Sequence, residues 1–251
     1  VTVTDDSGCT QIASATISDG AGGTLSQVVT NVDCNSNFTG DINITITGGT
    51  APFTYSWTGP NAFTAASEDI SALEAGTYNV TITDSVGCII NASIPITQPA
   101  VLAVTSTQIN ATCNGNTDGS INLNVSGGSV SYTYNWTGPN PFTATTEDIS
   151  GLEAGTYDVT VTDSLNCTQT AQIVITEPAV VAGSITGTNV SCNGGSTGTA
   201  DLTPTGGDGN YIFSWIGPGA FNSGLEDLTG LAAGTYDVTI TDGNGCTGTA
   251  Q

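Results

Sequence analysis

Residues 152–167 read LEAGTYDVTVTDSLNC, and this stretch decides the fold because it holds a strand, a turn and a cysteine. Tyr157, Val159 and Val161 alternate with polar residues, the period-two pattern of a strand with one buried face. The stretch recurs as LEAGTYNVTITDSVGC at 73–88 and as LAAGTYDVTITDGNGC at 231–246, a shift of 79 positions each time. The chain is therefore predicted to repeat one β-rich module with this period.

The period holds along the whole chain without a gap. Val1 aligns with Val80 and Gln251 with Gln172, so we expect the sequence to begin and end inside repeats. The predicted divisions are 1–20, the C-terminal part of a preceding repeat; 21–99, repeat 1; 100–178, repeat 2; and 179–251, repeat 3, cut short in its last strand.

Repeat 2 shows the expected strands most clearly. They are 120–126 (SINLNVS), 132–137 (YTYNWT), 156–162 (TYDVTVT) and 167–176, with an irregular first strand before Cys113. Only 147–152 has the spacing of a helical turn. About seven short strands around buried aromatics predict an all-β fold of tandem immunoglobulin-like β-sandwich modules, stacked head-to-tail. The predicted core aromatics are Trp57, Tyr78, Trp136, Tyr157, Trp215 and Tyr236.

The charge composition excludes several functions. The 251 residues include 22 acidic side chains and no Lys, Arg or His, so the formal charge is −22. Such a chain cannot neutralise phosphates, which excludes nucleic acid as a partner and disfavours anionic membranes. No apolar run is long enough to insert into a membrane. Without His or Lys the common nucleophile–base pairs are unavailable, so we expect no enzyme.

Three cysteine pairings fit the repeat register. They join Cys34 with Cys88, Cys88 with Cys113, or Cys34 with Cys167. In an immunoglobulin-like sandwich the cysteine after the first strand and the one before the last strand lie at opposite poles. A seven-residue strand separates them by about 23 Å, and a disulfide needs Cα atoms within about 7 Å.

This separation favours disulfides between successive modules, Cys34 with Cys167 and Cys113 with Cys246. Cys9, Cys88 and Cys192 would then pair with modules outside this sequence. A pairing inside one module and free thiols remain open alternatives, whereas zinc is disfavoured because there is no His and no C-x-x-C.

Acidic residues recur at two places in each copy, near the middle of the module and before its last strand. Carboxylates suit Ca²⁺, the one cofactor considered, but Asp in such turns more often bonds its own backbone, which is the favoured interpretation. The candidates are Glu68, Asp69, Asp84, Glu147, Asp148, Asp163, Glu226, Asp227 and Asp242.

The segments GGTAPFTYSWTGPNAF (48–63), LEAGTYNVTITDSVGC (73–88) and LAAGTYDVTITDGNGC (231–246) resemble SprB-type repeats, which are PKD-like modules. Such repeats occur in giant surface adhesins of Bacteroidetes, including gliding adhesins. The resemblance implies export, tandem arrays and display on the cell surface. Asp84-Ser85-Val86 and Asp163-Ser164-Leu165 also resemble the O-glycosylation signal of that phylum, which makes Ser85 and Ser164 candidate acceptors.

Together these features predict a structural stalk or filament segment of an extracellular bacterial surface adhesin. It would act as a repetitive spacer in adhesion or gliding. Its partners would be neighbouring repeats, other chains of a filament, or surface glycans. The alternative is an array of Ca²⁺- or glycan-binding modules appended to a secreted enzyme.

Overall fold

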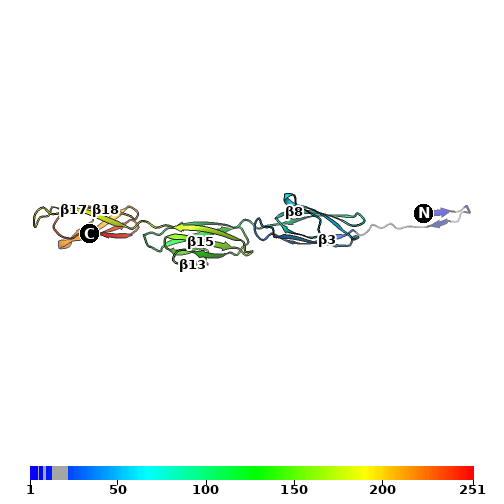
Figure 1. Ribbon diagram of the computed structural model, residues 1–251, viewed down its shortest axis with the longest axis horizontal. Helices are drawn as coiled ribbons and strands as arrows, with labels where there is room; N and C mark the ends of the chain where they lie inside the picture. The colour runs from blue at the N-terminus through cyan, green and yellow to red at the C-terminus, as the bar shows by residue number, and fades with distance from the viewer. Residues whose placement is uncertain (5, 8–9, 13–21) are drawn as a thin grey trace. The chain divides into compact units, whose positions relative to one another are not determined.

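The computed structural model describes residues 1–4, 6–7, 10–12 and 22–251 (Figure 1). The chain divides into two compact units, Val1–Ala100 and Val101–Gln251, which are described separately. Strands dominate both units, joined by turns and by two short 3₁₀ segments, η1 (Pro60–Ala62) and η2 (Pro218–Ala220). The all-β prediction is confirmed.

The first unit holds a short hairpin and one complete module. The hairpin pairs β1 (Thr2–Thr4) with β2 (Thr10–Ile12), and its pair Thr4–Thr10 corresponds to Thr83–Ile89 one repeat later. The module has a three-stranded and a four-stranded sheet, in the orders β3-β4-β7 and β6-β5-β8-β9. Its strands are β3 (Thr24–Thr30), β4 (Gly40–Thr47), β5 (Thr54–Thr58), β6 (Thr64–Ala65), β7 (Ile70–Leu73), β8 (Gly76–Thr83) and β9 (Ile89–Ile96).

The second unit holds two modules with the same strand order, β10-β11-β14 with β13-β12-β15-β16 and β17-β18-β21 with β20-β19-β22-β23. In repeat 2 the strands are β10 (Ala103–Ile109), β11 (Gly119–Ser126), β12 (Thr133–Thr137), β13 (Thr143–Ala144), β14 (Ile149–Leu152), β15 (Gly155–Thr162) and β16 (Thr168–Ile175). In repeat 3 they are β17 (Ala182–Thr188), β18 (Gly198–Thr205), β19 (Tyr211–Gly217), β20 (Phe221–Ser223), β21 (Leu228–Leu231), β22 (Asp237–Asp242) and β23 (Thr247–Ala250).

Each module is a seven-stranded sandwich in which the first and last strands end side by side. In repeat 2 the amide of Ala111, just after β10, donates to the carbonyl of Thr176, just after β16 (3.0 Å). The two strands therefore run in the same direction, as expected for an immunoglobulin-like sandwich. Each repeat has its own buried apolar cluster, centred on Trp57, Trp136 and Trp215.

A tryptophan and a tyrosine fix the core of every module. The indole Nε1 of Trp136 donates to the carbonyl of Thr146 (2.9 Å), which satisfies its buried polar atom. Tyr157 bonds the carbonyl of Glu153 four residues upstream (3.1 Å), the tyrosine-corner arrangement of immunoglobulin-like sandwiches. A Cβ at Gly138 would lie 2.6 Å from the Tyr157 ring, so this position requires glycine.

Five of the six predicted core aromatics are buried, and Tyr236 is only partly buried. In repeat 2 the equivalent Tyr157 is paired across the sheet with Ile173 of β16. In repeat 3 the last strand, β23, ends at Ala250, which is opposite Val238. Tyr236 therefore has no facing strand residue among those described.

Two local expectations were wrong. The stretch before Cys113 is a regular strand, β10, paired with β11 along its whole length. Residues 149–152 form strand β14 and no helical turn. Ile149 and Leu152 are both buried because Gly151 takes a φ of +73° and the register shifts beside it. A bulge therefore produced the three-residue spacing that resembled a helix.

Candidate functional site: the repeat junction

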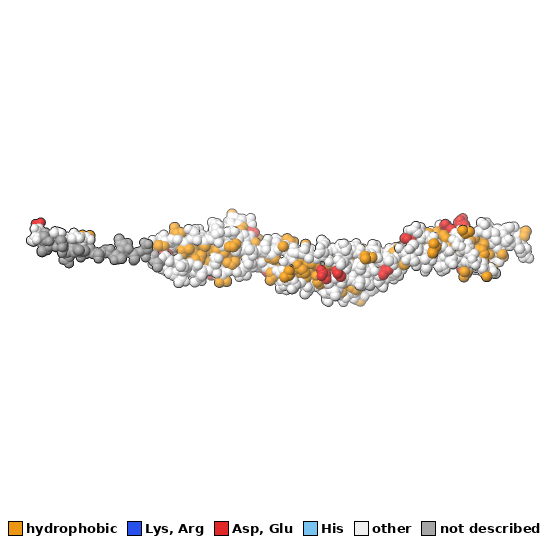
Figure 2. Space-filling model, turned by 180° about the vertical axis from the view of Figure 1, so that it is seen from behind, with side chains coloured by type: hydrophobic (Ala, Val, Ile, Leu, Met, Phe, Trp, Pro, Cys, Tyr) orange, Lys and Arg blue, Asp and Glu red, His pale blue; other side chains and the backbone are white. Residues whose placement is uncertain are grey.

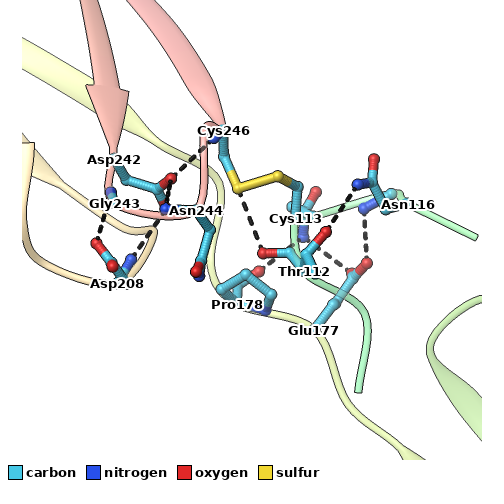
Figure 3. The surroundings of a disulfide bond; sticks show 12 residues. Thr112, Cys113, Asn116, Glu177, Pro178, Asp208, Asp242, Gly243, Asn244 and Cys246 are labelled. Carbon is cyan, nitrogen blue, oxygen red and sulfur yellow. Dashed lines mark hydrogen bonds between the residues drawn. A yellow bond between two sulfur atoms is a disulfide. The ribbon is translucent and has the colours of Figure 1, made fainter. Parts of the chain in front are cut away.

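The junction between repeats 2 and 3 is closed by a disulfide between Cys113 and Cys246, whose Cα atoms lie 5.5 Å apart (Figure 3). Cys113 belongs to the loop after the first strand of repeat 2, residues 110–118, here called the cysteine loop. Cys246 ends the turn before the last strand of repeat 3, residues 242–246, here called the cysteine turn. The pair is one of the two named from the sequence.

Asp242 positions Cys246 within the cysteine turn. Its Oδ1 accepts the amide of Cys246 (2.8 Å) and that of Asn244 (3.0 Å), and its Oδ2 accepts the amide of Asp208 (3.1 Å). The Asp242 side chain is buried and holds two turns together (Figure 3). By accepting the amide of Cys246, the carboxylate fixes the backbone of this residue and therefore the direction in which its side chain points.

The same arrangement recurs at Asp84 and Asp163. Oδ1 of Asp163 accepts the amides of Leu165 and Cys167, both at 2.9 Å. In repeat 1, hydrogen bonds from the amides of Cys88 and Thr50 lower the pKa of Asp84, and the Cys88 bond contributes most. The sequence identified these acids as turn caps, but it gave no indication that each one orients a cysteine.

The cysteine loop is braced by a hydrogen-bonded pair across its base. In repeat 2, Asp118 accepts both the amide and the hydroxyl of Thr112, and the hydroxyl contributes most to lowering the pKa of Asp118. In repeat 1 the two residue types are exchanged, since the Thr39 hydroxyl donates to Asp33 (2.7 Å). The exchange keeps the bond, and it could have been noticed by aligning the repeats.

The cysteine loop also grips the chain segment that leads to repeat 3. Oε2 of Glu177 accepts the amide of Gly115 (2.7 Å), and its Oε1 accepts the side-chain amide of Asn114 (2.9 Å). From the other side, the amide of Gly207 in repeat 3 donates to the carbonyl of Ala179 (2.9 Å). The linker, residues 176–181 between β16 and β17, is therefore hydrogen-bonded to both repeats that it connects.

Repeat 1 holds its own exit segment in the same way. The amide of Ser36 donates to Oε1 of Gln98 (2.8 Å), and the side chain of Asn35 donates to the carbonyl of Pro99 (3.0 Å). Hydrogen bonding between the cysteine loop and the exit segment therefore occurs in both repeats. It does not require a charged residue, because Gln98 of repeat 1 occupies the position of Glu177.

The remaining cysteines differ in state. Cys88 and Cys192 are exposed free thiols. Cys246, which is equivalent to Cys88, is buried. Cys34 and Cys167 are each disulfide-bonded, and Cys9 lies outside the described residues. The predicted partners of Cys9, Cys88 and Cys192 lie beyond this sequence and stay predictions.

The acids in the middle of each module bond to protein groups. Oδ1 of Asp69, Asp148 and Asp227 accepts the amide of Ile44, Leu123 and Leu202, respectively, at 2.9–3.0 Å. Burial raises the pKa of Tyr55 and Tyr134, and Glu68 and Glu147 beside them raise it further. Glu226 is exposed. Within the described ranges no group of three metal-binding side chains comes together.

Phe63 and Phe142 pack edge-on against Tyr78 and Tyr157, with ring centroids 5.3 Å apart. Ser85 and Ser164 are exposed, so their glycosylation stays a prediction. On the face in Figure 2 acidic side chains are scattered among polar and apolar ones and form no single patch.

A groove in repeat 3 runs beside Trp215 and Tyr236. In repeat 2 the corresponding space is filled by the last strand, whose Ile175 side chain packs within 3 Å of where a Cβ on Gly119 would lie. The groove is therefore the position of a last strand, and it presents no cluster of chemically active side chains.

The SprB repeat family matches the chain at three places, residues 26–62, 105–141 and 184–220. The matches are spaced by the repeat period and cover the first strand, the cysteine loop and the tryptophan strand. The chain contains three SprB repeats. It is thus a repetitive extracellular module array of the adhesin type, a type that is generally non-enzymatic.

The SprB repeats have distant structural similarity to immunoglobulin arrays. Dscam1 isoform 9.44, four N-terminal Ig domains, is 12% identical, with 91% of this chain and 72% of that chain covered and a TM-score of 0.28. The amphioxus IgVJ-C2 molecule is 12% identical, with 63% and 98% covered and a TM-score of 0.26. TM-scores this low support no conclusion about this chain, and the fold rests on its own strand order. No curated protein matches the chain.

SprB repeats belong to surface adhesins, and the disulfide is typical of an extracellular protein. In the part of the chain that the structure describes, no helix has the length and apolar character needed to cross a membrane.

Proposed function

We propose that this chain is a stalk segment of an extracellular bacterial surface adhesin. The repeats act as a spacer that sets the distance between the cell and the adhesive or gliding contact. The observation that carries the proposal is the Cys113–Cys246 disulfide, because it joins successive repeats by a covalent bond.

The linker supports the same function. Glu177 bonds to the cysteine loop behind it, and Ala179 bonds to Gly207 ahead of it. A linker bonded at both ends transmits orientation from one module to the next, which an unattached linker of a few residues would not do. In repeat proteins the interfaces between neighbours set the stiffness of the array.

The test is a deletion that keeps the register. Removing residues 100–178 from the full-length protein joins repeat 1 directly to repeat 3. Cys34 and Cys246 then have the same sequence separation that Cys113 and Cys246 have now. A spacer predicts unchanged surface display and a thread shorter by one repeat in electron micrographs. Cells should still attach to nearby surfaces, but the greatest distance at which they attach should be smaller.

The contrary result is loss of attachment at every distance with display unchanged, because that would place the binding site within the deleted repeat. A matched deletion of the same length in another copy, such as 21–99, separates the two cases. A spacer is insensitive to which copy is removed.

The competing ligand-binding function has its own measurement. Thermal unfolding of the purified chain with and without millimolar CaCl₂ should give the same midpoint, with MgCl₂ as the ionic-strength control. A rise specific to Ca²⁺ would favour a metal-binding array over a spacer. A rise with both salts would report only screening of the acidic surface.

A further inference from the structure

The disulfide divides the chain into two kinds of segment. Short segments run from a cysteine turn through the last strand, the linker and the next first strand to the following cysteine loop. In the second unit this is 167–192, which contains β16 and β17. Long segments, such as 113–167, contain the five remaining strands of a module. The two kinds have different positions relative to the cross-link.

We infer that the disulfides make the array almost inextensible, because they direct tension through the short segments and bypass the long ones. This deepens the proposed stalk function and rests on it only for its biological purpose. The inference requires that the Cys113–Cys246 link recurs with the repeat period, so that Cys34 is joined to Cys167. Both of those cysteines are disulfide-bonded.

The covalent path follows from the connectivity. A pull that arrives at Cys113 crosses the disulfide to Cys246 and continues along β23, so residues 114–245 are bypassed. The recurring link would send a pull from Cys34 to Cys167 and on along β16. Two covalent paths would then run side by side, and each repeat gives its first strand to one path and its last strand to the other.

The short segments are already nearly extended in the folded protein. Residues 168–191 lie between Cys167 and Cys192, and most of them belong to β16 and β17, which are already extended. Fully drawn out, the segment reaches about 90 Å and serves two repeats, so the limit is about 45 Å per repeat. A whole repeat without the cross-link could be drawn out to about 270 Å.

The redox chemistry is that of exported proteins. Each link forms when two thiols lose two protons and two electrons, which pass to an oxidised thiol–disulfide oxidoreductase as its own disulfide is reduced. A dithiol reductant reverses the step and is itself oxidised to a cyclic disulfide. Extensibility should therefore switch with the redox state of the cysteines.

The experiment is single-molecule stretching of the whole 251-residue chain, held at its two ends. Cys9, Cys88 and Cys192 are replaced by Ser in every protein so that no other pair can form. Oxidised, the chain should unfold to a contour length of about 31 nm, because the shortest covalent path runs from residue 1 to Cys34, crosses to Cys167, returns to Cys113, crosses to Cys246 and ends at Gln251. Reduced, it should reach about 85 nm, a nearly threefold change.

Two variants test the recurrence. Cys113→Ser with Cys246→Ser leaves only the link between Cys34 and Cys167, which has the same sequence separation as Cys113 and Cys246, so the oxidised variant should stop at about 40 nm, between the four-cysteine chain and the reduced chain. Replacing all four cysteines should give about 85 nm under both conditions. Contour length depends on connectivity alone, so loss of folding after the link has formed does not change it.

Two outcomes would overturn the inference. One is an oxidised chain with all four cysteines that extends to the reduced length, and the other is a Cys113→Ser, Cys246→Ser chain that does so. Neither outcome depends on adhesion. A chain that behaves as expected here but fails the register-preserving deletion keeps the mechanical inference and loses the spacer function.

Discussion

Cys113 is bonded to Cys246, a residue 133 positions further along the chain, and not to Cys167 of its own repeat. Cys167 directly precedes β16, whereas the loop of Cys113 contacts the segment directly after it. An eight-residue strand is about 27 Å long, so the two cysteines of one repeat lie at opposite poles. Each repeat can therefore only bond its neighbours.

Loss of this bond should destabilise the second unit. Cys246→Ser opens the loop that the disulfide closes over a separation of 133 positions, and chain entropy puts the loss at up to about 5 kcal/mol. Urea unfolding followed by tryptophan fluorescence in oxidising buffer measures it. Cys192→Ser is the matched control, because Cys192 is an exposed free thiol. Equal midpoints for both variants would show that the link adds no stability.

The linker grip should depend on an acceptor at position 177 and not on its charge. Glu177→Ala removes the acceptor for the amide of Gly115, which costs about 1 kcal/mol locally and speeds hydrogen exchange at Gly115 several-fold. Glu177→Gln keeps an acceptor, as Gln98 does in repeat 1, and should leave the exchange rate near that of wild type. A Gln variant as fast as the Ala variant would contradict this.

The aspartate before each cysteine turn should make stability pH-dependent. Hydrogen bonds, first from the amide of Cys88, lower the pKa of Asp84 below its ordinary 3.8 in the folded state. The stabilisation is therefore complete above about pH 4 and is lost as the pH falls through the folded-state pKa. Asp84→Asn should lower the melting temperature at pH 7, and its difference from wild type should shrink below pH 4.

The control for this comparison is Asp41→Asn, which removes one charge from the same repeat. It separates the hydrogen bonds from the general relief of repulsion in a chain with a formal charge of −22. A difference between Asp84→Asn and wild type that stays constant down to pH 2 would show that the carboxylate is not the stabilising form.

The bulge in β7 should be strained, because Ala72 has a φ of +56° where repeats 2 and 3 have Gly151 and Gly230. Ala72→Gly should stabilise repeat 1 by about 0.5–1 kcal/mol, since a left-handed backbone costs alanine about 1–2 kcal/mol and the unfolded-state entropy of glycine offsets part of that gain. Gly151→Ala is the reciprocal change. A Cβ there meets nothing closer than 3.9 Å, so its loss of about 1 kcal/mol would be conformational.

Both changes can be followed by chemical denaturation, with the tryptophan of each repeat as the probe. A destabilising Ala72→Gly would mean that the strain at this position is smaller than the entropy that glycine adds to the unfolded chain.

The strands were predictable wherever burial alternates simply. In β15 every second residue from Tyr157 is buried, and the predicted strand lacked one terminal residue. Strand β14 was misread because its two buried residues lie three apart across a bulge. Local periodicity cannot distinguish a bulged strand from a helical turn, since only the partner strand β11 supplies the register shift.

The acids show the same limit. Turn capping by Asp163 is a local property, and the sequence favoured it. That Asp163 also accepts the amide of Ser129, distant in the sequence, depends on which turns the sandwich brings to one pole. The matched exchange of Thr112 and Asp118 for Asp33 and Thr39 is visible in the sequence, but it has no meaning until the loop places the two positions together.

The sequence by itself determined the repeat period, the all-β class and the absence of any cationic side chain, because these are properties of residue order and composition. It also limited the cysteine pairings to three. Only the tertiary structure decided that Cys113 meets Cys246. A disulfide requires two Cα atoms within about 7 Å, and that proximity is set by strand direction, loop placement and the docking of one module on the next.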